Sequence, residues 1–158
     1  MSLDFHRSAA INELLSKSAA LEQALSEFLA LPPYDSSDRR RASKIVCSIA
    51  FEHAESAKLL MATGNYTSAV GLVRLQYEAL VRAMWLLYAA SDESVLKLMR
   101  ELSTESAQKA NSIPMLTEML EKLEGKAPSE ALGMLHEFKE YSWKPLSSFV
   151  HGGIVSTR

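Results

Sequence analysis

The stretch from Tyr66 to Ala90 constrains the fold of this chain more than any other. It holds twenty-five residues and three formal charges, Arg74, Glu78 and Arg82, spaced four apart. Residues four apart share one face of a helix, so the three charges would form a single stripe. The other faces are apolar or small, which predicts a helix at the centre of the molecule.

The charged stripe has two interpretations. On a surface, an ion pair between residues four apart contributes only a few tenths of a kcal/mol. Inside a bundle an unpaired charge is costly, so Glu78 would bridge the arginines or accept other donors. We favour such a structural network of Arg74, Glu78 and Arg82. The alternative is that one arginine points its planar guanidinium into a cleft and holds an anion by two parallel hydrogen bonds.

The flanking sequence predicts further helices. Apolar residues recur at three- and four-residue intervals up to Pro32 and Pro33, which indicates a one-faced amphipathic first helix. Ser36 or Ser37 would cap the second helix, and Gly64 would end it. We expect helices over about residues 3–31, 38–63, 66–90, 91–109, 114–122 and 128–144. Their inward residues include Ile11, Leu14, Leu15, Leu21, Leu25, Phe28 and Leu29 in the first, and Val46, Ile49, Ala50, His53, Ala57, Leu60 and Met61 in the second.

The pattern as a whole is that of an all-α protein. Glycine and proline together make up 11 of 158 residues, and no alternating run of branched residues bounded by turns indicates a strand. We predict an antiparallel helical bundle of five to seven helices, forming one domain over residues 1–158. Pro145 should break or kink the last helix, leaving residues 146–153 as a short final turn.

Composition excludes several classes of protein. A net charge of -2 argues against binding nucleic acid by bulk positive charge. Cys47 is the only cysteine, so neither an intrachain disulfide nor a cysteine metal cluster can form, which fits a reducing compartment. The first fifteen residues lack the pattern of a secretory signal, and charges interrupt the longest apolar stretch. We therefore expect a cytoplasmic protein without a membrane segment.

Motif spacing argues against metal and cofactor chemistry. None of the four histidines has a glutamate three residues before it, and there is neither a His-Glu-x-x-His pattern nor a phosphate-binding loop. We expect no metal and no cofactor. His53 is better explained as a packed residue than as a ligand, and the basic run Arg39 to Arg41 as a solvated helix start.

His151, at the end of the segment LSSFVHGG, is the second candidate site residue. A histidine in the last helical turn can simply bond free carbonyls and benefit from the helix dipole. Because histidine titrates near neutral pH, it could also serve as a general acid or base. Ser147 and Ser148 lie nearby, but no second group is placed to activate either as a nucleophile.

Two segments carry a family resemblance: GNYTSAVGLVRLQYEALVRAMWLL and, about sixty residues later, SSFVHGG. Over about residues 51–153 the chain resembles uncharacterised bacterial helical domains related to the HEPN superfamily, with an Arg-x-x-x-Glu central helix. The resemblance implies, for active members, a metal-independent ribonuclease of toxin-antitoxin or phage-defence systems. Its motif is an arginine, four to six residues, then a histidine, paired across a homodimer. The histidine falls on His151, and the arginine position holds Lys144.

Lys144 keeps the positive charge but lacks the two-pronged grip of arginine on a phosphate. We therefore favour a non-catalytic HEPN-like interaction or regulatory module, a homodimer that binds a partner protein or RNA. The alternative is a ribonuclease in which His151 acts as acid or base and Lys144 stabilises the phosphate, with help from Arg74 or Arg82. A third hypothesis is a ligand pocket lined by Trp85, Tyr77 and the charged stripe.

Overall fold

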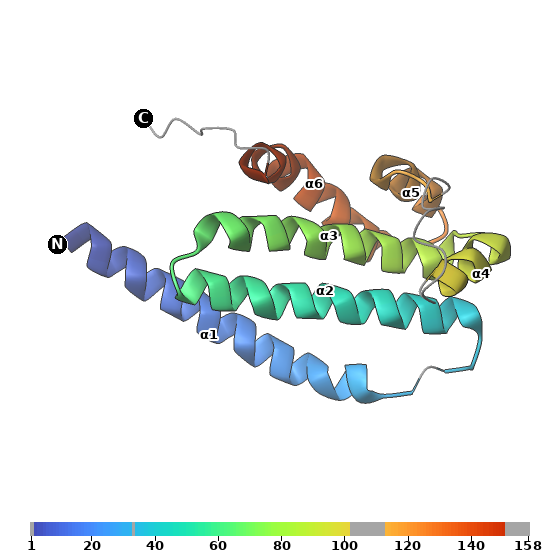
Figure 1. The fold of residues 1–158 in the computed structure, drawn as a ribbon, viewed down its shortest axis with the longest axis horizontal. Helices are drawn as coiled ribbons and strands as arrows, with labels where there is room; N and C mark the ends of the chain where they lie inside the picture. Colours follow the sequence, from blue (N-terminus) through green and yellow to red (C-terminus); the bar gives the residue numbers. More distant parts are fainter. Residues whose placement is uncertain (1, 33, 102–112, 151–158) are drawn as a thin grey trace.

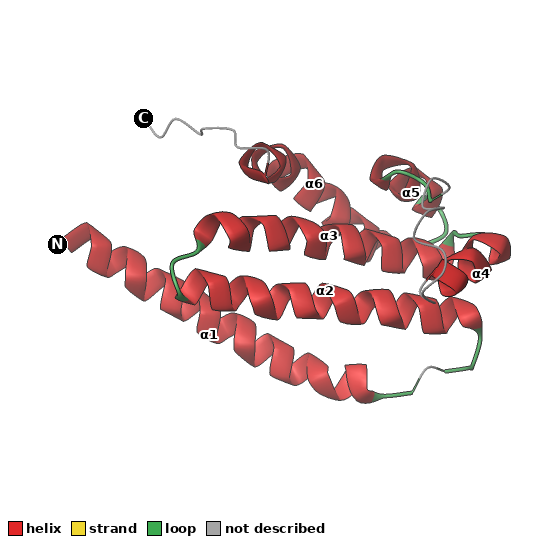
Figure 2. Cartoon of the chain, viewed as in Figure 1, coloured by secondary structure: helices red, strands yellow, loops and turns green. Residues whose placement is uncertain are grey.

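The computed structural model describes residues 2–32, 34–101 and 113–150, which form six helices and no strand. The all-α prediction is confirmed for these residues (Figures 1 and 2). No helix among them is long and apolar enough to cross a membrane. The helices are α1 (Ser2–Ala30), α2 (Asp38–Ala62), α3 (Tyr66–Tyr88), α4 (Asp92–Glu101), α5 (Leu116–Leu123) and α6 (Ser129–Val150).

An antiparallel pair of helices, α2 and α3, forms the centre of the fold, as the sequence predicts for α3 (Figure 1). Gly64 joins them with a φ of 80°, a left-handed conformation that glycine adopts without strain. Helices α5 and α6 pack against α3, and α4 packs against α2. Helix α1 lies along α2 and shares far less contact with it than α3 does. Among the six described helices, α3 therefore shares the most contact with its neighbours.

The core combines a row of small residues with larger side chains. Helix α2 turns alanines toward α3, which lets the two backbones approach closely. The largest fully buried side chains come from α3, α4 and α5: Val81, Leu86, Val95, Met119, Leu120 and Leu123. Ile49 was expected in the buried row and is instead 37% exposed.

Several element ends differ from the sequence-based expectation. Helix α6 continues through Pro145 to Val150, so the chain does not break at this proline, and residues 146–150 are not a separate turn. Ser37 is the N-cap residue of α2, as expected, but its hydroxyl bonds Asp35 rather than the helix backbone. Helix α5 begins two residues after Pro114, at Leu116. Helix α4 is described to Glu101, and its expected continuation to residue 109 lies outside the described residues.

Arg39 connects the start of α2 to the end of α3. Its guanidinium donates to the carbonyl of Leu86 at 2.7 Å and to that of Ala90 at 2.8 Å, and pairs with Asp92 at 2.7 Å. The last carbonyls of a helix have no partner within the helix, so Arg39 satisfies groups that would otherwise be orphaned. The prediction that the whole basic run is solvated is therefore wrong for Arg39.

Replacing Arg39 with methionine should lower the free energy of unfolding by about 2 kcal/mol, because charged hydrogen bonds to two helix-end carbonyls are lost. Arg41 is the matched control, since it is exposed and, among the described residues, its side chain pairs with Asp38 at 3.4 Å on the same helix. Arg41→Met should change stability by less than about 0.5 kcal/mol. Urea denaturation measures both values, and equal losses would contradict a clamping role for Arg39.

Candidate functional site

Two charges of the predicted stripe lie where α6 packs on α3. The Nε of Arg74 donates to Oε1 of Glu78 at 3.0 Å, and both side chains are half-buried. The guanidinium carbon of Arg74 also lies 4.8 Å from the centre of the Trp143 ring, within the range of a cation–π interaction. Arg74 thus contacts a carboxylate of its own helix and an aromatic ring of α6, and the contact with Trp143 helps to hold α6 on α3.

Arg82, the third member of the stripe, is not paired with Glu78. Its Nε is buried and has no hydrogen-bond partner among the described residues. The expected bridge, in which Glu78 joins both arginines, is therefore formed on the Arg74 side alone. The three residues lie on one helix, as the spacing predicts. Arg74 and Glu78 pair with each other, whereas Arg82 takes no part in that pair.

Tyr77 is a packing residue of the same interface. It is buried, and its hydroxyl donates to the carbonyl of Leu135 at 2.8 Å. Its ring stacks on Phe138 with the centroids 4.7 Å apart, and a tilted contact reaches Trp143 at 5.7 Å. Helix α6 therefore covers Tyr77, so the hypothesis that it shares a ligand pocket with Trp85 gains no support. Burial raises the pKa of the Tyr77 hydroxyl from 10.0 to about 12.

The raised pKa of Tyr77 predicts a loss of stability in strong base. Below pH 10 the phenol is protonated in both states. Between pH 10 and about 12 the unfolded chain loses the proton while the folded protein keeps it, so stability falls as pH rises. Tyr77→Phe should be about 1 kcal/mol less stable than the wild type at pH 8, because the bond to Leu135 is lost. This gap should close by pH 11 to 12 in urea titrations, and a gap that stays constant would contradict the assignment.

The residues expected to act in catalysis are only partly described. Lys144 is exposed on α6, beside Trp143. His151 lies outside the described residues, so its distance from Lys144 and from the arginines stays untested. Among the described residues, no three histidine, cysteine, aspartate or glutamate side chains are grouped to hold a metal ion.

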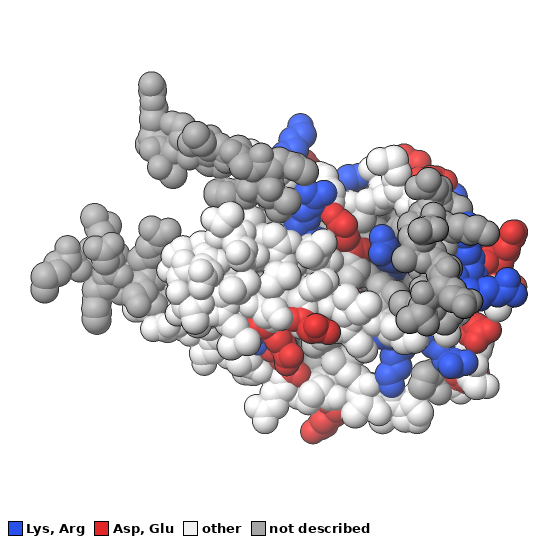
Figure 3. Space-filling model, viewed as in Figure 1, with Lys and Arg blue, Asp and Glu red and all other residues white. Residues whose placement is uncertain are grey.

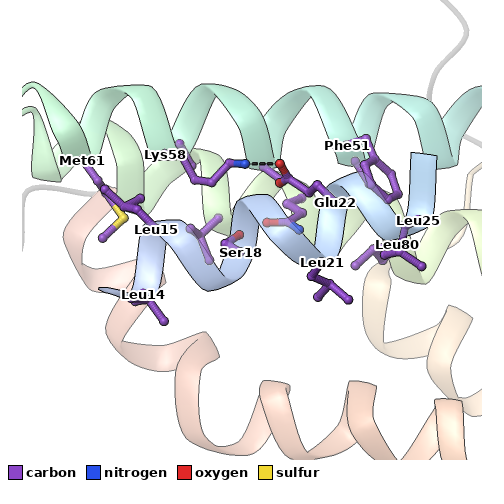
Figure 4. A pocket seen from close by; sticks show the side chains of 15 residues that line it. Leu14, Leu15, Ser18, Leu21, Glu22, Leu25, Phe51, Lys58, Met61 and Leu80 are labelled. Atoms are coloured by element: carbon purple, nitrogen blue, oxygen red, sulfur yellow. Dashed lines mark hydrogen bonds and ion pairs between the residues drawn. The ribbon is translucent and has the colours of Figure 1, made fainter. Parts of the chain in front are cut away.

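A second feature is an apolar groove between α1, α2 and α3, which we call the α1 groove (Figure 4). Its volume is about 320 Å³. The ion pair between Glu22 of α1 and Lys58 of α2 lies within it and ties the two helices together. The other side chains that line it are mostly apolar, and they include Leu14, Leu15, Leu21, Leu25, Phe51, Met61, Val73 and Leu80.

Helix α1 leaves a row of large apolar side chains largely exposed, and two of them, Leu14 and Leu21, also line this groove. Leu14, Leu21 and Phe28, which we call the α1 row, are spaced seven residues apart and are 59%, 60% and 70% exposed. The first helix expected from the sequence is confirmed, but it is not amphipathic with a single apolar face, because its apolar residues do not all face the core. The seven-residue spacing was the signal for a row that the fold leaves largely exposed, and an interpretation that assigns every apolar residue to the core misses it.

The segment in which α2 turns into α3 carries no charge. Residues 59–73 contain no lysine, arginine, aspartate or glutamate. On the face shown in Figure 3, uncharged side chains cover this end, and most of the charged side chains lie toward the other. Leu59 and Tyr66 are exposed there. A protein surface without charges next to exposed apolar residues is characteristic of an interface.

A comparison with known protein families assigns most of the chain to one family. Residues 47–158 match the family of unknown function DUF6988. The chain belongs to this family. The DUF6988 match begins within α2 and contains α3, the charged stripe, and helices α4 to α6, whereas α1 precedes it. No curated protein and no solved structure matches the chain.

Proposed function

We propose that this member of DUF6988 is a non-catalytic helical interaction module that pairs with a second copy of itself through α1. The observation that carries the proposal is the exposure of the α1 row. Burying a side chain such as leucine or phenylalanine is worth about 1.5–3 kcal/mol, so three of them per copy provide a strong driving force for association.

The spacing of the α1 row favours a second copy as the partner. Apolar residues repeated with alternating steps of three and four are the pattern of helices that pair side by side. A two-fold dimer lets the same row face itself. Glu13 and Lys17, the charges beside the row, neutralise each other through an ion pair of 2.7 Å. The repeat consists of Ile11, Leu14, Leu21, Leu25 and Phe28, and the polar Ser18 occupies the one position between Leu14 and Leu21.

The HEPN-like character is part of the same proposal. Its support is the all-helical bundle and the Arg74–Glu78 pair on the central helix. The engagement of Arg74 by Glu78 and Trp143 favours a scaffolding role for this arginine over phosphate binding.

Sedimentation equilibrium tests the self-pairing. We expect a species of twice the 17.5 kDa chain mass that dissociates on dilution. A single-chain mass at all concentrations would overturn the proposal. The α1 row would then be a binding surface for a different protein.

A ribonuclease assay separates the module from the enzyme. Single-stranded and structured RNAs are incubated with excess chelator and either the wild type or His151→Ala, purified identically. We expect no cleavage by either protein. Chelator-resistant cleavage that disappears in His151→Ala would instead establish a metal-independent nuclease.

A further inference from the structure

The α1 groove is long and narrow. Its α1 wall extends from Leu14 to Leu25, and its α2 wall extends over the same number of residues, from Ala50 to Met61. Because an α-helix rises about 1.5 Å per residue, each wall is about 16 Å long. Dividing the volume of about 320 Å³ by this length gives a mean cross-section of about 20 Å². Such a cross-section is close to that of one extended hydrocarbon chain, and the volume lies at the lower end of small-molecule sites.

The polar side chains of the groove lie in its middle. Figure 4 shows Ser18, Glu22 and Lys58 between one apolar end near Met61 and another near Phe51. Glu22 and Lys58 neutralise each other in their ion pair, and both side chains are mostly buried. A second charge in this groove would have to be buried without a partner, which is costly. The groove therefore favours a neutral ligand with two apolar arms.

Gln76 provides a hydrogen-bonding group that a ligand can reach. It stands between Val73 and Leu80 on the α3 wall of the groove, and it is only partly buried. Its side-chain amide can donate two hydrogen bonds and accept two. No hydrogen bond to this side chain is formed within the described part of the chain. A polar group that lines an apolar groove without a partner indicates where the polar group of a ligand would lie.

We infer that the α1 groove binds a neutral, elongated molecule with a carbonyl group between two apolar arms. The amide N–H of Gln76 donates to the carbonyl oxygen, and the arms extend along α1 and α2 to the two apolar ends. A fatty acid fits less well, because its carboxylate needs a cation and Lys58 is already paired with Glu22. The inference does not depend on self-pairing, since every residue that lines the groove belongs to one chain.

Two isomeric ketones test the position of the carbonyl group. Dipentyl ketone carries it in the middle of the chain and methyl nonyl ketone carries it near one end, while their apolar content is the same. NMR of the methionine methyl groups reports binding at Met61, which lines the groove, with the exposed Met134 of α6 as the reference. Met61→Leu and Met134→Leu assign the two signals. We expect dipentyl ketone to move only the Met61 signal and to bind about tenfold more tightly than its isomer, the difference of one hydrogen bond.

Three variants separate the hydrogen bond from packing and from self-pairing. Gln76→Leu keeps a side chain of similar size but loses the donor, so it should bind the two ketones equally. Gln23→Leu makes the same change on the exposed surface of α1, outside the groove, and should keep the tenfold preference. Phe28→Glu changes a residue of the α1 row that does not line the groove. At dilutions where single chains dominate, it should bind dipentyl ketone as the wild type does.

The inference is wrong if dipentyl ketone leaves the Met61 signal in place, if the wild type binds the two isomers equally, or if Gln76→Leu keeps the preference. It is also wrong if dipentyl ketone dissociates the pairs, because side chains of the second copy would then occupy the groove. A failure of self-pairing gives a different result, since single chains would still bind the ketone and show the preference.

Discussion

Replacing Leu21 with glutamate should convert the paired protein into single chains. Leu21 is the middle residue of the α1 row, is 60% exposed in one copy and lies at the groove rather than in the buried core, so the substitution costs the single chain little. In the pair, two copies of this side chain lose their burial and two negative charges enter an apolar interface. We expect the dissociation constant to rise at least about 100-fold, since each lost side chain costs about 1.5–3 kcal/mol. Sedimentation velocity measures the change.

Ser16→Glu is the matched control for this experiment. It adds the same charge to the same helix, but residue 16 faces away from the α1 row. The control should sediment as the wild type does. Far-ultraviolet circular dichroism should show the same helix content in all three proteins. If Leu21→Glu and Ser16→Glu weaken association equally, general charge repulsion rather than the α1 row explains the effect.

Leu86→Ala should produce a large loss of stability. Leu86 is 0% exposed and packs in the main core, so its truncation removes buried methyl groups and leaves a cavity. Such substitutions cost about 2–5 kcal/mol. Leu75, on the same helix, is 44% exposed, and Leu75→Ala should cost less than about 1 kcal/mol. Urea denaturation at one fixed protein concentration compares the two variants.

Fixed concentration matters for this comparison because self-pairing adds concentration-dependent stability. Similar losses in the two variants would contradict the placement of α3, since they would mean that Leu75 and Leu86 are buried to the same extent.

The central helix could be predicted because its sequence leaves few alternatives. Three charges at four-residue spacing in an otherwise apolar stretch fit a helix with one charged stripe, and they do not fit the two-residue alternation of a strand. The i,i+4 pair of Arg74 and Glu78 follows directly from helix geometry. Its contact with Trp143 could not be predicted, because it depends on where α6 packs, which local spacing does not determine.

The bonds of Arg39 to the end of α3 could not be predicted from the sequence either, because they too depend on how distant helices pack. Its partners Leu86 and Ala90 are about fifty residues away, and a basic run at a helix start gives no sign of them. At Pro145, by contrast, tertiary packing overrides a local rule. Local rules predict a break or a kink at a proline inside a helix, and α6 continues through it without a break. Tertiary packing of the preceding residues, such as Trp143 on Tyr77, can hold the helix together across one lost hydrogen bond.

The α1 row was visible in the sequence but was open to a second interpretation. Apolar periodicity indicates a helix with a buried face, and it does not reveal whether that face is covered by the same chain or by another. Only the fold distinguishes the two, by leaving Leu14, Leu21 and Phe28 exposed.

Hydrogen–deuterium exchange at several protein concentrations tests the burial of α1 most directly. Peptides covering residues 9–31 are compared between dilute samples, where single chains dominate, and concentrated samples, where pairs dominate. We predict that exchange in these peptides slows as concentration rises, because pairing buries and stabilises α1. Exchange in α5, which lies away from the α1 row, should not change. If the mass doubles while exchange in α1 stays the same, the copies pair through another surface and the proposed role of α1 is wrong.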